Sequence, residues 1–167
     1  MALIVEDGTG KTNADSFVET ADVDAYVLKF GLAFAGTTTE KEVACRQATR
    51  YLESVYSLRI LGSRVSIDQS LSWPRVGVID RDGFAFGSDL VPQEWKDATC
   101  EMAVVARVET ILPDLATPGD LNEKSVTVGP ISVSKRWDSG QGQLKYYRRV
   151  DLLVKRFVIA SSAVVRS

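Results

Sequence analysis

The sequence Pro92-Gln-Glu-Trp-Lys-Asp-Ala-Thr-Cys-Glu-Met-Ala-Val-Val-Ala106 predicts the helix around which the other elements pack. Pro92 suits the first turn of a helix, where its missing N–H is not needed, and Glu94 follows in the same turn. Apolar residues then recur with a period of 3.6 residues up to Pro113. They are Trp95, Ala98, Met102, Val105, Ala106 and Leu112. The sequence therefore predicts a central helix that ends before Pro113.

Two more helices are predicted in front of this one. A short helix begins with Thr20 as its N-cap and ends at Gly31, a residue type suited to the position after a helix C-terminus. A longer helix begins at Thr39, which forms a capping-box pattern with Glu42. Its apolar stripe continues to about Ser57.

Two long segments have no helical period. Residues 1–16 contain a short apolar run followed by glycine-rich turns, which is typical of an extended arm. Residues 58–91 are interrupted by Gly, Pro and Asp, and a connection of this length is uncommon unless it is packed or functional. We expect this segment to wrap around the helical bundle. Leu71 and Trp73 alternate with serines in it, which indicates a short half-buried strand.

The C-terminal part predicts a β element and a fourth helix. Apolar and polar residues alternate from Val126 to Ser134 around Gly129-Pro130, which is typical of a hairpin or one bent edge strand. A helix over about residues 144–159 places its apolar side chains on one arc and its cations on the opposite arc, with Leu152 among them. The predicted fold is mainly α, a small bundle of about four helices with a short β-hairpin or bent strand and extended arms.

Charge is divided unequally along the chain. Residues 1–123 hold 11 Lys and Arg against 20 Asp and Glu, whereas residues 124–167 hold 9 against 2, so the net charges are −9 and +7. We expect an acidic helical core with its arm and wrapping loop in residues 1–123. Residues 124–167 add the β element and a basic helix to the same single domain.

The basic helix has three interpretations. Its cations contact nucleic acid, or an acidic protein surface that includes a second copy of the chain, or they form a solvated face. The residues alone leave these interpretations open. The candidate contact residues are Lys135, Arg136, Lys145, Arg148, Arg149, Lys155 and Arg156.

Composition argues against catalysis. The chain has no histidine, which excludes Ser-His-Asp, Cys-His and His-bearing zinc sites. Cys45 and Cys100 lie 55 positions apart without a CxxC spacing, so buried free thiols are predicted. We therefore predict that the protein is not an enzyme and holds no cofactor and no metal.

Two motifs resemble ligand-binding loops and fail on their spacing. Gly8-Thr-Gly-Lys-Thr12 ends like a phosphate-binding loop, but that pattern requires glycine at position 5, where this chain has valine. A flexible turn is predicted instead. Asp80, Asp82 and Gly83 are not followed by the glutamate of a calcium loop, and a turn is predicted there too.

Targeting signals are also missing from the sequence pattern. No uncharged run exceeds ten residues, so no membrane-spanning helix is predicted. The first residues lack a basic region and a cleavage site, and Glu6 and Asp7 follow closely, so we expect a cytoplasmic product.

Several ordered blocks resemble a known family over about residues 1–160. With them the chain is similar to a tailed-bacteriophage family whose members are often labelled DnaT-like single-stranded DNA-binding proteins and look like head-tail connector or adaptor proteins of the virion neck. The blocks are Met1-Ala-Leu-Ile-Val-Glu-Asp-Gly-Thr-Gly10, Asn13-Ala-Asp-Ser16, Ala21-Asp22, Ala48-Thr-Arg-Tyr-Leu52, Asp68-Gln-Ser-Leu-Ser-Trp-Pro-Arg75, Asp80-Arg-Asp-Gly83, Val91-Pro92 and Val128-Gly-Pro-Ile-Ser132.

This resemblance implies a structural role in the virion neck and no catalytic residues. Many copies, typically twelve, would form a ring beneath the portal protein, extend the DNA channel without reading its sequence, and contact the next neck or tail-completion protein. Assembly would take place in the host cytoplasm. The family label implies an alternative, a single-stranded DNA-binding protein of a replication primosome. We favour the neck because polarised charge suits subunit or portal contacts. Single-strand binding also uses exposed aromatic side chains for base stacking, and Trp137 is the only aromatic residue near the cations that we expect to be exposed.

Overall fold

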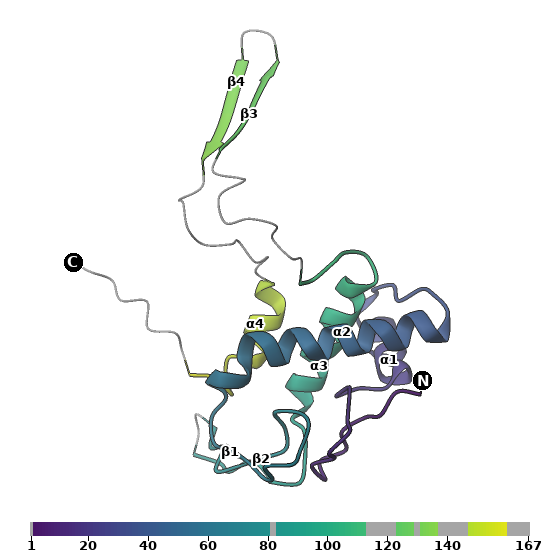
Figure 1. Ribbon diagram of the computed structural model, residues 1–167, viewed down its shortest axis with the longest axis vertical. Helices are drawn as coiled ribbons and strands as arrows, with labels where there is room; N and C mark the ends of the chain where they lie inside the picture. Colours follow the sequence, from purple (N-terminus) through teal and green to yellow (C-terminus); the bar gives the residue numbers. More distant parts are fainter. Residues whose placement is uncertain (1, 81–82, 113–122, 129–130, 137–146, 160–167) are drawn as a thin grey trace, which may run out of the picture. The chain divides into compact units, whose positions relative to one another are not determined.

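The computed structural model describes residues 2–80, 83–112, 123–128, 131–136 and 147–159. For residues 123–128 and 131–136 it describes the backbone but not the side chains. The mainly α fold class is confirmed, because the described residues contain four α-helices and only short strands (Figure 1). Residues 1–111 with 147–167 form one compact unit, and residues 112–146 form another. The helices are α1 (Thr20–Phe30), α2 (Thr38–Tyr56), α3 (Gln93–Ala106) and α4 (Arg148–Val154), and a 3₁₀ turn covers Ser57–Arg59.

Helix α3 supplies the centre of the helical unit. Trp95 is fully buried, and its ring lies edge-on to three other rings. The centroid distances are 6.1 Å to Phe17 of the arm, 6.3 Å to Tyr56 of α2 and 5.9 Å to Trp73 of the wrapping segment. Such pairs add about 0.5–1.5 kcal/mol each beyond the burial of their area. Because the indole N–H groups of Trp73 and Trp95 have no hydrogen-bond partner among the described residues, apolar burial and ring contacts hold this centre.

The starts of α1 and α2 lie earlier than the sequence predicted. Helix α2 is capped by Thr37, whose Oγ1 accepts from the N–H of Glu40 at 3.3 Å, while the Glu40 carboxylate accepts from the N–H of Thr37 at 2.8 Å. The predicted box of Thr39 and Glu42 is therefore wrong by two residues. Three consecutive threonines let the same pattern fit two registers, and Glu42 lies 3.7 Å from an arginine of its own helix instead.

Helix α1 shows the same small shift at its start. Its N-cap is Glu19 rather than Thr20, and the Asp22 carboxylate accepts from the N–H of Glu19 at 2.8 Å. The predicted end is confirmed, because Gly31 adopts the left-handed conformation with φ +66°.

Helix α3 is shorter than predicted at both ends. Pro92 is its N-cap rather than its first helical residue, and the helix ends at Ala106 instead of Leu112. Beyond this point the guanidinium of Arg107 donates to the carbonyl of Ala35 at 2.9 Å, and Val108 is 84% exposed. The apolar period thus continues in the sequence beyond the end of the helix.

The segment between α2 and α3 packs onto the helices, as expected. Leu71, Trp73 and Val78 are buried, and a two-residue antiparallel ladder joins β1 (Ser63–Arg64) to β2 (Arg75–Val76). The guanidinium of Arg75, only 7% exposed, donates to four backbone carbonyls, those of Ile60, Leu61, Gly62 and Ser72. A buried polar group satisfied in this way fixes an irregular backbone without a regular sheet.

The half-buried strand predicted at Leu71 and Trp73 is wrong. Ser72 between them is buried as well, so polar and apolar side chains do not alternate between water and core. The reason is Glu53 of α2, whose carboxylate accepts from both the N–H (3.0 Å) and the hydroxyl (2.5 Å) of Ser72. Because Ser72 has a polar partner inside the fold, it is buried like Leu71 and Trp73, and the alternation of polar and apolar residues does not indicate a half-buried strand here.

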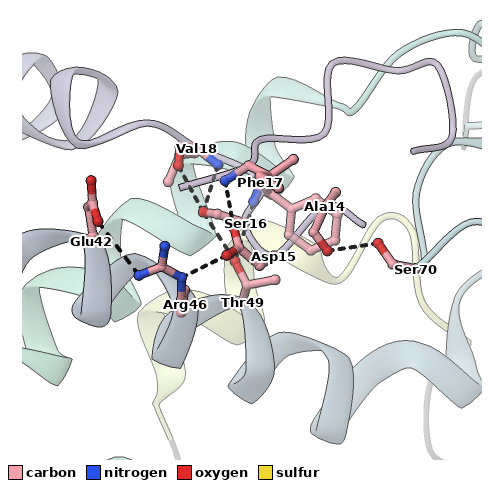
Figure 2. Close-up of polar contacts among 10 residues, drawn as sticks. Ala14, Asp15, Ser16, Phe17, Val18, Glu42, Arg46, Thr49 and Ser70 are labelled. Atoms are coloured by element: carbon pink, nitrogen blue, oxygen red, sulfur yellow. Dashed lines mark hydrogen bonds and ion pairs between the residues drawn. The ribbon is translucent and has the colours of Figure 1, made fainter. Parts of the chain in front are cut away.

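The N-terminal arm is held against α2 by polar contacts (Figure 2). The Asp15 carboxylate accepts from the N–H of Ile4 at 2.8 Å and from Nε of Arg46 at 2.7 Å. The hydroxyl of Thr49 accepts from the N–H of Phe17 at 3.3 Å. These bonds seat the arm so that the Phe17 ring enters the core.

The turn at Gly8–Thr12 is built around a buried carboxylate. Glu6 is fully buried and accepts from the N–H groups of Gly8, Gly10 and Lys11 at 2.9, 2.9 and 2.8 Å. Gly8 has φ +105°, and a Cβ there would lie 2.0 Å from the carbonyl oxygen of Asp89. The expected flexible turn is thus a fixed loop that packs against the end of the wrapping segment.

The second unit contains the β element. Strands β3 (Glu123–Val128) and β4 (Ile131–Arg136) pair antiparallel, with Val128 opposite Ile131 and Glu123 opposite Arg136. Of the two forms left open by the sequence, the hairpin is therefore confirmed.

Replacing the buried carboxylate of the arm should destabilise the fold. Glu6→Ala leaves three inward-facing N–H groups without their acceptor, and we expect a loss of about 3 kcal/mol in the free energy of unfolding. Glu6→Gln keeps one acceptor oxygen and should lose less. Urea unfolding followed by circular dichroism measures both, with Asp68→Ala, an exposed carboxylate, as the control. Equal midpoints for Glu6→Ala and wild type would contradict this role of the loop.

A second stability prediction concerns pH. Burial raises the pKa of Glu53 above its ordinary value of 4.5, against the effects of Ser72 and the guanidinium of Arg75. The folded chain therefore binds this proton more tightly than the unfolded chain, and the contribution of Glu53 to stability falls as pH rises from 4.5 towards the raised pKa. Glu53→Gln removes the titration, so the stability of wild type minus that of the variant should shrink with rising pH in urea titrations. A difference that grows with pH would disprove the assignment.

Candidate functional site

Helix α4 is placed by its apolar side, which faces the core. Val150 and Val154 are buried, and Tyr147 just before the helix stacks edge-on against Tyr51 of α2 at 5.4 Å. The hydroxyl of Tyr147 donates to Glu109 at 2.9 Å. These contacts turn the opposite side of α4 towards solvent.

The helix is shorter than the predicted range of residues 144–159. Tyr147 has non-helical backbone angles. At the other end the chain becomes extended and pairs with the segment after α2, where the N–H of Leu61 donates to the carbonyl of Phe157 at 2.8 Å and the N–H of Ile159 donates to that of Arg59 at 2.8 Å. Backbone pairing with a distant segment therefore ends the helix while its amphipathic pattern continues.

Three of the predicted cations form an exposed group on α4 and its C-cap residue, which we call the cationic face. Arg148, Arg149 and Lys155 are exposed, and none of them has an ion-pair partner within the described part of the chain. Leu152 lies among them and is 48% exposed, as the arc predicted. The first and last cations are seven residues apart, about 10 Å along a helix. The face can offer positive charge to an anion without first breaking an ion pair.

Arg156 differs from these three cations because it makes ion pairs and ring contacts within the fold. Its guanidinium pairs with Glu94 of α3 and with Asp80 of the wrapping segment, the latter at 3.2 Å. It also covers the rings of Phe86 and Phe157 at 5.3 and 5.5 Å from their centroids. We therefore assign Arg156 to the fold rather than to the cationic face.

The remaining candidates belong to the other unit. Lys135 and Arg136 are the last residues of β4, in register with Lys124 and Glu123. Their side chains, together with Lys145 and Trp137, lie outside the described residues.

One exposed aromatic residue was missed by the sequence analysis. Phe84 is 73% exposed and follows Gly83, whose φ of +88° confirms the predicted turn. A bulky apolar residue directly after an Asp-Gly turn was the available signal, since turn tips face solvent.

The described residues contain no group of His, Cys, Asp and Glu side chains arranged to hold a metal ion. Both cysteines are buried free thiols, as predicted, and burial raises the pKa of Cys45 to about 12 and raises that of Cys100 as well. Such thiols are poor nucleophiles because the thiolate is disfavoured. Within the same residues, no helix has the length and apolar character that a membrane span requires.

Fold and surface together define a small, mainly helical protein that presents a short cationic helix. The sequence matches the family described as "Putative DnaT-like ssDNA binding protein" over residues 1–167, and the chain belongs to this family. Comparison with curated proteins and with solved structures finds no match.

Arg149 of α4 and Arg156, which follows the helix, should differ in a stability measurement. Arg156→Ala removes two partly exposed ion pairs and the cover over two rings, so we expect a loss of about 1 kcal/mol in the free energy of unfolding. Arg149→Ala removes no described contact and should stay within about 0.5 kcal/mol of wild type. Urea unfolding of both variants tests the division, and equal effects would show that it is wrong.

Proposed function

We propose that the protein binds single-stranded DNA through the cationic face of α4. The observation that carries this proposal is the exposure of Arg148, Arg149 and Lys155 without a described acidic partner, on a chain that belongs to a DnaT-like family. Guanidinium and ammonium groups in such a position contact phosphate oxygens. The binding is electrostatic and does not read sequence.

The remaining charges of the helical unit favour a local contact. Several of its carboxylates pair with cations of the same surface: Asp24 pairs with Lys41 at 2.6 Å, and Asp15 pairs with Arg46 at 2.7 Å. The cations of the cationic face, by contrast, have no ion-pair partner within the described part of the chain. A strand of DNA would lie along α4 rather than spread over the whole acidic unit.

Salt dependence tests this proposal directly. Each phosphate contact on a single strand changes the slope of log K against log salt by about 0.7, so three contacts give about −2. The triple variant Arg148→Ala, Arg149→Ala, Lys155→Ala should therefore bind a labelled oligo-dT more weakly and with a slope shallower by about 2. Fluorescence anisotropy between about 50 and 200 mM NaCl measures it.

The control for this experiment is Lys29→Ala, which removes a cation from α1, where Lys29 lies 5.5 Å from the Phe30 ring. This variant should retain the wild-type slope. If the triple variant also retains it, DNA does not contact the cationic face.

A second candidate is the head-tail adaptor of a virion neck. Large apolar side chains on the helical unit favour it, since Leu28 is 84%, Leu58 98% and Phe30 53% exposed, and exposed apolar groups support protein contacts. The aromatic residues that flank α4, Tyr147 and Phe157, pack on Tyr51 and Trp73. They therefore offer no ring next to the cationic face for base stacking, which favours a protein partner for this face. As an adaptor, the protein would bind the portal, the next neck protein and copies of itself, with DNA passing through the ring.

Electron microscopy separates the two candidates. Negative-stain images of the protein mixed with a portal protein should show rings or portal caps for an adaptor. A single-stranded DNA-binding protein should leave portals bare and shift oligo-dT. Bare portals together with salt-independent binding would contradict both.

A further inference from the structure

The most exposed aromatic side chain in the described residues is Phe84, and its backbone is hydrogen-bonded on both sides. The N–H of Phe84 donates to Oδ1 of Asp80 at 2.8 Å, and its carbonyl accepts from the N–H of Asp80 at 2.9 Å. The N–H of Gly83 closes the turn on the carbonyl of Asp80 at 3.1 Å, and Ile79 pairs with Ala85 across it. These bonds hold the backbone of Phe84 at the end of the turn, and its side chain is exposed.

The same turn is tied to the end of α4. The second carboxylate oxygen of Asp80 pairs with the guanidinium of Arg156 at 3.2 Å, so one side chain connects the backbone of Phe84 to α4. Lys155, a member of the cationic face, precedes Arg156 in the chain and is exposed. Asp80 and Arg156 thus connect the turn that carries the exposed ring to the chain next to Lys155.

The neighbouring ring shows what the fold itself requires here. Phe86 packs against Phe157 at 5.1 Å and lies beneath Arg156, so it closes the core at this edge. The fold makes no such use of Phe84, which remains 73% exposed. An isolated exposed apolar residue is ordinary. Here the exposed ring belongs to a turn that Asp80 joins to Arg156, the residue after Lys155, and exposed rings near cations are what single-stranded nucleic acids use for stacking.

We infer that Phe84 is a stacking platform for one base of a single strand whose phosphates lie on the cationic face. This inference rests on the proposed function and deepens it, because it assigns the base contact that α4 lacks. It also implies tolerance of base identity, since every base has a π-face.

The test compares two oligonucleotides of equal length, oligo-dT and an abasic strand, by anisotropy. Phe84→Ala should weaken oligo-dT binding by about tenfold and leave the abasic affinity and the salt slope unchanged. Phe84→Tyr should restore oligo-dT binding, whereas Phe84→Leu, apolar but without a π-face, should not. Phe30→Ala, at the exposed ring of α1, should bind like wild type.

Other results of these binding measurements would contradict either the stacking role of Phe84 or the proposed function as a whole. If wild type prefers oligo-dT to the abasic strand and Phe84→Ala keeps that preference, the inference is wrong while the proposed function stands. If Phe84→Leu binds like wild type, the contact is apolar docking rather than stacking. If wild type binds neither strand, both proposals fail. Because the side chain is exposed, unfolding midpoints of the variants should match wild type and exclude misfolding.

Discussion

Edge-to-face contact around Trp95 is the interaction on which the rest of the helical unit depends. The ring of Trp95 meets side chains from the arm, from α2 and from the wrapping segment, and Trp73 continues the series to Phe157 after α4 at 5.6 Å. Segments that lie far apart in the chain therefore share one apolar centre. The cationic face is exposed because the opposite side of the same helix reaches this centre.

Polar groups fix the irregular segments around that centre. Glu6 gathers three N–H groups of the arm, and Arg75 gathers four carbonyls of the wrapping segment. Each charge is solvated by backbone dipoles instead of water, which meets the requirement that buried polar groups be hydrogen-bonded. Glu6, Asp15 and Arg75 belong to the sequence blocks that carry the family resemblance, so a large part of that resemblance describes how the fold is held.

The sequence predicted what depends on local patterns. The end of α1 at Gly31 and the end of α2 near Ser57 follow from period and turn chemistry. The hairpin is one of the two forms that the alternation predicted. The ends of α3 and α4 did not, because Arg107 and the pairing of Phe157 with Leu61 depend on partners far away in the chain. For the candidate site, the exposure of Arg148 and Arg149 followed from the helical arc. The ion pairs of Arg156 could not be predicted from the arc, because their partners Asp80 and Glu94 are distant in sequence.

The loop after Glu6 has a consequence for how such sequences are interpreted. Glycines and a lysine arranged to surround a phosphate do surround an anion here, but the anion is a carboxylate of the chain itself. The Glu6 carboxylate already accepts from the N–H groups that a nucleotide phosphate would need. A Gly-Lys-Thr signature preceded by a nearby acidic residue can therefore mark an intramolecular lock, and such a glutamate is the residue to look for before ATP is assigned to a loop of this kind.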